Sequence, residues 1–370
     1  MKVLFLSIAT GYGHHACARA AMDYLCGRGA ECEMLDAMDY VNPILGQVVS
    51  KGFLLSSKYL DDIYSSVYRF TELKSEPSPR ISISRLTHTL FSKRLESFLD
   101  EYDADVIVCT HVFAAQMVTQ LLTARKSKIR AKTIGIITDF TIHPYWEDTE
   151  LDYYVVASDM LANQFARKGL SSEKILPFGI PIGANFSGGM AKDEARARLG
   201  IEDKNTVLIM SGSMGFGNVI KPLKQLDSLA EFDFQIITVC GNNQKMKKSI
   251  DKLATTKKIY NYAFTEQVDL MMDAADCIVT KPGGVTTSEA LAKGLVVIMN
   301  SNIPGQEERN MEFLLNNGLA MRATKTFPLD ECIYHLFENP VRLEMARKLA
   351  RAVAKPDAAR RLGEFILDKK

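Results

Sequence analysis

The sequence predicts an α/β protein with two domains, each built on a parallel sheet covered by helices. Short apolar runs typical of buried strands alternate with helical patterns over residues 1–177 and again over 184–355. The chain has 370 residues, more than the roughly 250 to 300 residues at which a single core stops growing. Between the two alternations, residues 176–183 are rich in Pro and Gly without a regular period, which is typical of a link between domains.

The first alternation opens on the apolar run Val3-Leu4-Phe5-Leu6, a buried strand, followed by an Ala-rich helix. Strands are expected at 3–8, 31–35, 105–109, 132–137 and 151–156, with helices at 16–26, 112–125 and 158–167. In the second alternation, strands are expected at 206–210, 234–239, 258–261, 277–280 and 295–299. Charged helices fill the end of the chain, and we expect the last one, within 356–370, to cross back onto the first domain.

Composition excludes several classes of protein. The formal net charge is only +1, so no global field attracts nucleic acid, and no nucleic-acid partner is expected. The seven cysteines are scattered without a Cys-x-x-Cys pair, as in reduced cytosolic proteins. No leader pattern opens the chain and no apolar run reaches the roughly 20 residues of a membrane span. We therefore expect a cytoplasmic protein.

The turn after the first strand reads Gly11-x-Gly13 followed by His14 and His15, with Asp36 at the end of the second strand. This spacing imitates the dinucleotide fingerprint, so an NAD-dependent oxidoreductase stays open. The two imidazoles stand where the helix begins, a position that can present a reactive group. His14 is therefore a catalytic candidate, whereas His15 is interpreted as a solvated or supporting side chain.

Residues 44–95 interrupt the alternation. Aliphatic and aromatic residues recur at mostly helical spacing. The segment has eight basic and four acidic residues, which gives a local charge of +4. Such a segment suits the surface of an anionic bilayer. The alternative, helices that pack on their own domain with a solvated face, stays open.

Further candidates follow the later strands of the first domain, because function in parallel sheets gathers beyond the carboxyl ends of strands. Asp139 and His143 are site candidates there. His111 and Trp146, the only Trp, lie in comparable positions, and for both a packed core role stays open.

In the second domain, the strand at 277–280 runs directly into Lys281-Pro282-Gly283-Gly284 and then a helical pattern. A helix start after two glycines offers unpaired N–H groups and the positive end of the helix dipole to an anion. Glu289, later in that helix, could accept hydrogen bonds from a ribose. Glycine-rich segments also follow the strands at 206–210 and 295–299, so the three turns are expected to converge on a nucleotide diphosphate.

With these motifs, the chain resembles the monogalactosyldiacylglycerol synthase and processive diacylglycerol glucosyltransferase family, relatives of the peptidoglycan N-acetylglucosaminyltransferase. The resemblance covers nearly the whole chain and rests on Thr10-Gly-Tyr-Gly-His14, Thr138-Asp139 with His143 and Trp146, the loop 212–217, Lys281-Pro-Gly-Gly-x-Thr-x-x-Glu289 and Pro304-Gly-Gln306-Glu307 with Asn310. It implies a GT-B fold, two Rossmann-like domains facing across a cleft. The donor would bind in the second domain and the acceptor in the first.

The resemblance also implies roles for single residues. In the donor domain, Gly215, Phe216, Gly283, Gly284 and Thr286 would cradle the UDP phosphates, Glu289 the ribose, Phe264 and Thr265 the uracil, and Gln306, Glu307 and Asn310 the donor sugar's side of the site. On the acceptor side, His14 would act as base with Asp139 as a possible orienting neighbour, and Gly13, His143 and Trp146 would lie near the lipid. Tyr12 and His15 depart from the plant-type Gly-Gly-Gly-His-Arg pattern, so regulation by anionic lipid need not transfer.

The implied activity is inverting transfer of a hexose from UDP-glucose or UDP-galactose to diacylglycerol or a related glycolipid, at the inner face of the cell membrane. No cofactor is expected, and no metal either, because no His, Cys or carboxylate cluster shows ligand spacing. Besides the oxidoreductase, a UDP-sugar 2-epimerase of similar architecture and a catalytically idle UDP-sugar sensor stay open.

Overall fold

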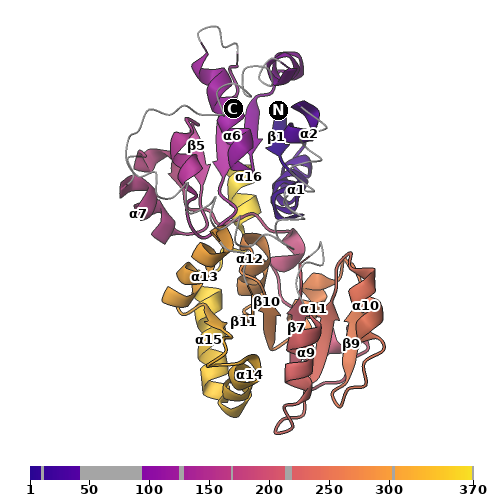
Figure 1. Ribbon diagram of the computed structural model, residues 1–370. Helices are drawn as coiled ribbons and strands as arrows, with labels where there is room; N and C mark the ends of the chain where they lie inside the picture. The colour runs from indigo at the N-terminus through magenta and orange to yellow at the C-terminus, as the bar shows by residue number, and fades with distance from the viewer. Residues whose placement is uncertain are drawn as a thin grey trace. The chain divides into compact units, whose positions relative to one another are not determined.

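The computed structural model describes residues 1–9, 12–41, 94–124, 129–167, 170–212, 219–301 and 305–368. The chain divides into two compact units, drawn in Figure 1. Unit 1 comprises mainly Met1–Gly183 with Asp357–Lys370, and unit 2 comprises Ala184–Ile303 with Glu307–Pro356. Most of segment 44–95, together with Gly215 and Phe216, lies outside the described residues.

Unit 1 contains a parallel six-stranded sheet in the order β2-β1-β3-β4-β5-β6. The strands are β1 (Lys2–Ser7), β2 (Glu31–Asp36), β3 (Val106–Cys109), β4 (Lys132–Ile136), β5 (Tyr153–Val155) and β6 (Ile175–Leu176). The helices include α1 (Tyr12–Cys26), α2 (Ala37–Val41), α6 (Val112–Thr123), α7 (Asp159–Arg167) and α16 (Ala358–Asp368), with the 3₁₀ turns η1 (Pro144–Asp148) and η2 (Ser172–Lys174). The central strands are fully buried because helices cover both faces, which explains their continuous apolar runs.

The C-terminal helix α16 packs within unit 1 (Figure 1, yellow), against the N-terminal helix α1. Phe365 stands edge-on to Tyr153 with ring centroids 4.9 Å apart, and it also contacts Phe178. Tyr24 of α1 donates to the carboxylate of Glu364, 3.3 Å away. The C-terminal helix therefore packs against the first helix and a strand of the N-terminal sheet.

Unit 2 holds a second parallel six-stranded sheet, in the order β12-β11-β10-β7-β8-β9. Its strands are β7 (Thr206–Met210), β8 (Gln235–Val239), β9 (Ile259–Tyr262), β10 (Cys277–Thr280), β11 (Val296–Met299) and β12 (Ala320–Arg322). Its helices are α8 (Lys192–Leu199), α9 (Ile220–Asp227), α10 (Gln244–Ile250), α11 (Val268–Ala274), α12 (Gly284–Ala292), α13 (Gln306–Asn316), α14 (Leu329–Glu338) and α15 (Pro340–Val353), with the 3₁₀ turn η3 (Ala184–Phe186). Strand order reverses between β7 and β10, and ligands of such sheets bind beyond the carboxyl ends of the strands at that point.

The predicted α/β architecture with two Rossmann-like sheets is confirmed. Two short strands were not anticipated. Ile175–Leu176 forms β6, which pairs in parallel with β5, inside a segment interpreted as part of the link between domains. Ala320–Arg322 forms the edge strand β12. Each is only two or three residues long, too short to show a period in the sequence.

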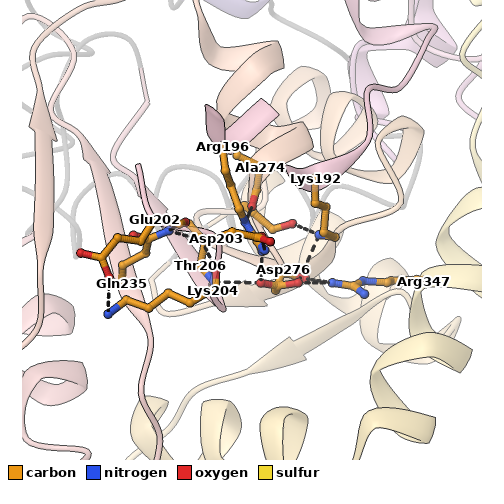
Figure 2. Close-up of polar contacts among 11 residues, drawn as sticks. Lys192, Arg196, Glu202, Asp203, Lys204, Thr206, Gln235, Ala274, Asp276 and Arg347 are labelled. Atoms are coloured by element: carbon orange, nitrogen blue, oxygen red, sulfur yellow. Dashed lines mark hydrogen bonds and ion pairs between the residues drawn. The ribbon is translucent and has the colours of Figure 1, made fainter. Parts of the chain in front are cut away.

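A buried ion cluster lies at the amino end of β10 (Figure 2). The carboxylate of Asp276, 6% exposed, receives Arg196 at 2.9 Å, Arg347 at 2.6 Å and Lys192 at 3.2 Å. The backbone N–H of Thr206, the first residue of β7, also donates to it at 2.8 Å. Burial alone would raise the pKa of Asp276, but the three cations and the Thr206 N–H outweigh burial and hold that pKa below its ordinary value. One carboxylate thus joins α8, α15, β7 and β10.

We expect Asp276→Asn to destabilise the protein strongly, by about 3–5 kcal/mol, because removal of one partner leaves buried cations without their counter-charge. The matched control is Glu194→Gln, which removes the partner of Arg198 from an ion pair whose side chains are more than half exposed. Urea unfolding followed by circular dichroism measures both variants. Equal midpoints for the two would show that the cluster does not stabilise unit 2.

Candidate functional site

His14, in the first turn of α1, lies beside the carboxyl ends of β1 and β3. These two strands are neighbours in the sheet, paired as Leu6 with Cys109, and strand order reverses at this point. The Nδ1 atom of His14 is 2.7 Å from the backbone carbonyl of Thr110 and 3.2 Å from the hydroxyl of Thr138. Residues from two other segments, Thr110 and Thr138, therefore hold this imidazole.

The hydrogen bond to Thr110 assigns the tautomer of the neutral His14 ring. A carbonyl oxygen can only accept, so Nδ1 carries the hydrogen and Nε2 keeps its lone pair. The Thr110 carbonyl is itself held, because the Thr110 hydroxyl donates to Ser7 at 3.0 Å and the Thr110 N–H to Leu6 O at 3.1 Å. The atom that could accept a proton is Nε2.

Two further imidazoles, those of His111 and His143, lie at this end of the sheet in the opposite tautomer. The ring of His111 stands edge-on to His14 with centroids 4.7 Å apart. His111 caps α6 by accepting at Nδ1 from the N–H of Phe113, and His143 caps η1 by accepting at Nδ1 from the N–H of Tyr145. Both neutral rings therefore carry their hydrogen on Nε2, so this end of the sheet combines one proton acceptor with two donors.

Burial keeps the rings of His14 and His111 neutral. Desolvation lowers the pKa of His14 to about 4; the hydrogen bond to Thr110 opposes that shift and the nearby His15 adds to it. Desolvation also lowers the pKa of His111 well below its ordinary value, and the imidazoles of His14 and His143 add to the effect. At neutral pH, His14 is therefore an uncharged base.

The other predicted residues of unit 1 occupy different surroundings. Gly13 precedes His14 in the first turn of α1, and Asp139 is half-buried just beyond β4. Trp146 is 4% exposed and stands edge-on to Tyr154, over Gly135, where any side chain would collide with the indole. An acceptor-side role of Trp146 would therefore act through packing rather than direct contact. The orienting role of Asp139 and the acceptor-side roles of Gly13 and His143 stay predictions.

Asp36, the acidic residue of the dinucleotide-like spacing, is engaged by backbone. Its Oδ1 accepts from the N–H groups of Met38 and Asp39, at 3.0 and 2.9 Å, and its Oδ2 accepts from Ala9 at 2.7 Å. The carboxylate thus caps α2 and holds the end of β1. His15 Nε2 lies 3.8 Å from Asp36 Oδ2, which agrees with the supporting role interpreted from the sequence.

In unit 2, the start of α12 is open to an anion. Gly283 is the N-cap residue, with φ −74° and ψ 135°, and no side chain caps the helix. A Cβ on Gly283 would meet nothing within 4 Å, so neither backbone strain nor packing demands glycine there. The N–H groups of the first turn, from Gly284 to Thr286, point out of the helix start as expected for a phosphate cradle.

Lys281, at the end of β10, joins the turns around this helix start. Its Nζ lies 2.6 Å from Glu307 Oε1, the second residue of α13, and both side chains are partly buried. A Cβ on Gly212, after β7, would lie 3.5 Å from Lys281 Cε, and Gly212 has the left-handed φ of +79° that favours glycine. Asn310 of α13 is fully buried and donates to the carbonyl of Pro282 at 3.1 Å. The segments after β7, β10 and β11 therefore converge.

These contacts refine the roles predicted for α13. Asn310 holds the Pro282 turn, and a direct contact with donor would require its exposure. Glu307 is paired with Lys281, so a sugar hydroxyl would share or replace that partner. Gln306 lies at the first position of α13. The donor contacts of all three stay predictions.

Glu289 lies on α12, one and a half turns after the cradle. Desolvation raises the pKa of its carboxyl to about 8, and the nearby negative charge of Asp269 on α11 adds to the shift. Without a ligand, this carboxyl is largely protonated at neutral pH. Hydrogen bonds from a diol would favour its ionised form.

Phe264 and Thr265 follow β9 at the same edge of the sheet. Phe264 is 47% exposed, a conspicuous fraction for a large aromatic ring, and the Thr265 hydroxyl accepts from the N–H of Gln267 at 3.2 Å. An exposed ring beside a turn can stack on a planar base. The uracil contact of both residues stays a prediction.

The sequence analysis assigned no role to three groups that the structure brings into the two sites. Thr110 acts through its carbonyl, and Thr138 through a hydroxyl, next to a residue that had been singled out. Lys281 carried a recognisable signal, a cation at the end of a strand before Pro-Gly-Gly. Among the described ranges, no three His, Cys, Asp or Glu side chains come close enough together to hold a metal ion.

Comparison with known families assigns each half of the chain. Residues 14–182 match the monogalactosyldiacylglycerol (MGDG) synthase family, and residues 206–362 match the glycosyltransferase family 28 C-terminal domain. The processive diacylglycerol beta-glucosyltransferase of Bacillus pumilus is 27% identical over 374 aligned residues, which cover 100% of this chain and 95% of that protein. The two halves are therefore joined in the same order in a relative of similar length.

Solved structures show the fold. MurG of Acinetobacter baumannii is 15% identical, with a TM-score of 0.65 and 99% of each chain covered. The UDP-GlcNAc 2-epimerase of Neisseria meningitidis, solved with UDP-GlcNAc, is 14% identical, with a TM-score of 0.60 and 100% of each chain covered. The predicted GT-B fold is confirmed. The similarity to the epimerase, at 14% identity, concerns the fold and not the activity.

The raised pKa of Glu289 predicts how binding of uridine depends on pH. Diol hydrogen bonds favour the ionised carboxylate, so affinity should rise as the pH increases toward about 8 and level off above it. Uridine is the probe because it carries no phosphate that titrates in this range. Isothermal titration calorimetry from pH 6 to 9 measures the dissociation constant.

Glu289→Gln should weaken uridine binding and abolish the pH dependence below pH 8. Glu312→Gln, which removes an exposed carboxylate from α13, serves as the control and should keep the wild-type slope. A slope that survives in Glu289→Gln would exclude Glu289 as the group responsible.

Proposed function

We propose that this protein transfers a hexose from a UDP-sugar to diacylglycerol or a related glycolipid, because residues 14–182 match the MGDG synthase family and residues 206–362 match the glycosyltransferase family 28 C-terminal domain. Unit 2 would bind the donor and unit 1 the acceptor. The full-length relative from Bacillus pumilus, whose name states diacylglycerol as its acceptor, supports the acceptor class.

The observation that carries the proposal is the uncapped start of α12, where Gly283 leaves the first-turn N–H groups open and Lys281 stands beside them. N–H groups and a helix dipole stabilise a diphosphate, and the charge on that diphosphate grows as UDP leaves. In our proposal, Lys281 shifts from Glu307 toward the phosphates when the donor binds. Glu307 is then released for a hydroxyl of the sugar.

His14 is the proposed general base. Its Nε2 would take the proton of the acceptor hydroxyl while that oxygen forms a bond to the anomeric carbon, and the bond to UDP breaks with its electron pair going to the phosphate. Displacement from the opposite face inverts the anomeric centre. The Thr110 carbonyl, which accepts from Nδ1–H, would stabilise the imidazolium that forms, with Asp139 as a further candidate for this role.

We also propose that the leaving group is stabilised without a metal ion. The N–H groups at the start of α12 and the Lys281 ammonium supply positive charge where a metal would otherwise be needed. Transfer that EDTA abolishes and Mg²⁺ or Mn²⁺ restores would contradict this part of the proposal.

The proposal also concerns which sugar is transferred and where in the cell the protein acts. The matched family is named for galactose and the Bacillus relative for glucose, and Gln306 and Glu307 could bind either epimer. We propose action at the inner face of the cell membrane, where segment 44–95 would contact anionic lipid. Within the described residues, no helix is both long and apolar enough to cross a bilayer.

The test of the proposed function is transfer itself. Purified protein is incubated with UDP-glucose or UDP-galactose and with vesicles that contain diacylglycerol, and lipid extracts are analysed by mass spectrometry. Addition of one or more hexoses to diacylglycerol is expected with at least one donor. Conversion of a UDP-sugar to its epimer without a lipid product would favour the epimerase instead.

We expect His14→Ala to lower the rate of transfer by about 10²–10⁴, because a positioned general base contributes that much. UDP affinity should not change, since the donor cradle lies in unit 2. The neutral imidazole is the active form, so at saturating donor the wild-type rate should stay level as the pH falls from 8 to 6 and decline toward about 4. His15→Ala is the control. A wild-type rate in His14→Ala would exclude this base.

A further inference from the structure

Helix α15 exposes an apolar stripe on the surface of unit 2. Val341, Met345 and Leu349 stand at positions i, i+4 and i+8, on one face of the helix. They are 72%, 60% and 40% exposed. Only three other large hydrophobic side chains in the described residues are strongly exposed, and they belong to separate elements: Tyr12, Met160 and Phe264. Single exposed apolar residues are ordinary, whereas a contiguous row marks an interaction surface.

The stripe is distinct from the face by which α15 packs on its own unit. Ala350 on the opposite side is buried, and Leu343 and Ala346 pack against the core of unit 2. The helix thus has an inner apolar face that packs on unit 2 and an outer apolar face that is exposed. From Val341 to Leu349 the outer stripe runs for about 12 Å along the helix, at 1.5 Å per residue.

The charges beside the stripe are mainly basic. Among the exposed residues of α15, Arg342, Lys348 and Arg351 carry positive charge, against Glu344 alone. Glu344 is 4.0 Å from Lys348, the outer limit of an ion pair. A convex row of aliphatic side chains bordered by cations fits an interfacial helix, whose apolar side enters the acyl boundary while its basic residues meet anionic headgroups.

We propose that this stripe of α15 docks unit 2 on an anionic lipid bilayer. None of the three stripe residues belongs to either candidate site. The inference deepens the proposed function, since a lipid acceptor lies in a bilayer, but it rests on exposure and charge. One amphipathic surface anchors weakly by itself, so α15 acts as one of at least two attachments.

Flotation with phosphatidylglycerol-containing vesicles tests the proposal on the full-length chain and requires no sugar transfer. The double variant Met345→Gln/Leu349→Gln should partition about tenfold more weakly than wild type, because two apolar contacts with the bilayer are lost. Arg342→Gln/Lys348→Gln should lose binding to anionic vesicles and not to phosphatidylcholine vesicles, and added salt should reduce the difference.

Met160→Gln is the matched control, since it removes a methionine that is 43% exposed on α7, where no apolar stripe continues it. It should float like wild type. All variants should keep the thermal transition of wild type and its transfer rate on diacylglycerol in detergent micelles. Wild-type flotation of Met345→Gln/Leu349→Gln would overturn the proposal.

The alternative binding partner of the stripe is a second copy of the chain. Light scattering that shows a wild-type dimer, dissociated by Met345→Gln/Leu349→Gln, would overturn bilayer docking as well. If wild type floats through α15 but transfers no sugar to any lipid, the docking inference stands and the proposed function fails. The two results are therefore separable.

Discussion

The uncapped helix start in unit 2 depends on a charge buried at the other end of the strand that precedes it, β10. Asp276 precedes β10, and Lys281-Pro282-Gly283 follows it. A buried carboxylate is costly unless its partners arrive together, and here they come from α8, α15 and the first residue of β7. The cluster therefore fixes β7 beside β10. Those are the two strands whose carboxyl ends carry Gly212 and the start of α12.

At both candidate sites, desolvation favours the uncharged form of the key side chain. Burial lowers the pKa of His14 to about 4 and raises the pKa of Glu289 to about 8, so at neutral pH both groups are mainly uncharged in the absence of substrate. Lys281, the cation at the cradle, is neutralised by Glu307. Each site thus holds little net charge at rest. Under the proposed function, the interactions that favour the charged forms would arise when ribose, phosphate or an acceptor proton enters.

The helices and strands were predictable from the sequence where a pattern of neighbouring residues determines them. Apolar runs located β1, β3, β7 and β10, and glycines after strand ends located the helix starts. Contacts between distant residues left no such signal. Arg347 reaches Asp276 across 71 positions, and Lys281 meets Glu307 across 26. Thr110 orients His14 through a backbone carbonyl, an atom that every residue has, so residue type could not reveal it.

The dinucleotide-like turn shows why the local pattern was ambiguous. A Gly-x-Gly turn before a helix, with an acid at the end of the next strand, is compatible with NAD only if that acid can accept from a ribose. In this fold, both lone-pair positions of Asp36 Oδ1 are used by backbone N–H groups of α2, and Oδ2 already accepts from Ala9. The first turn of α1 beside it presents the imidazole of His14. Unit 1 therefore offers a base at this helix start, and the uncapped helix start belongs to α12.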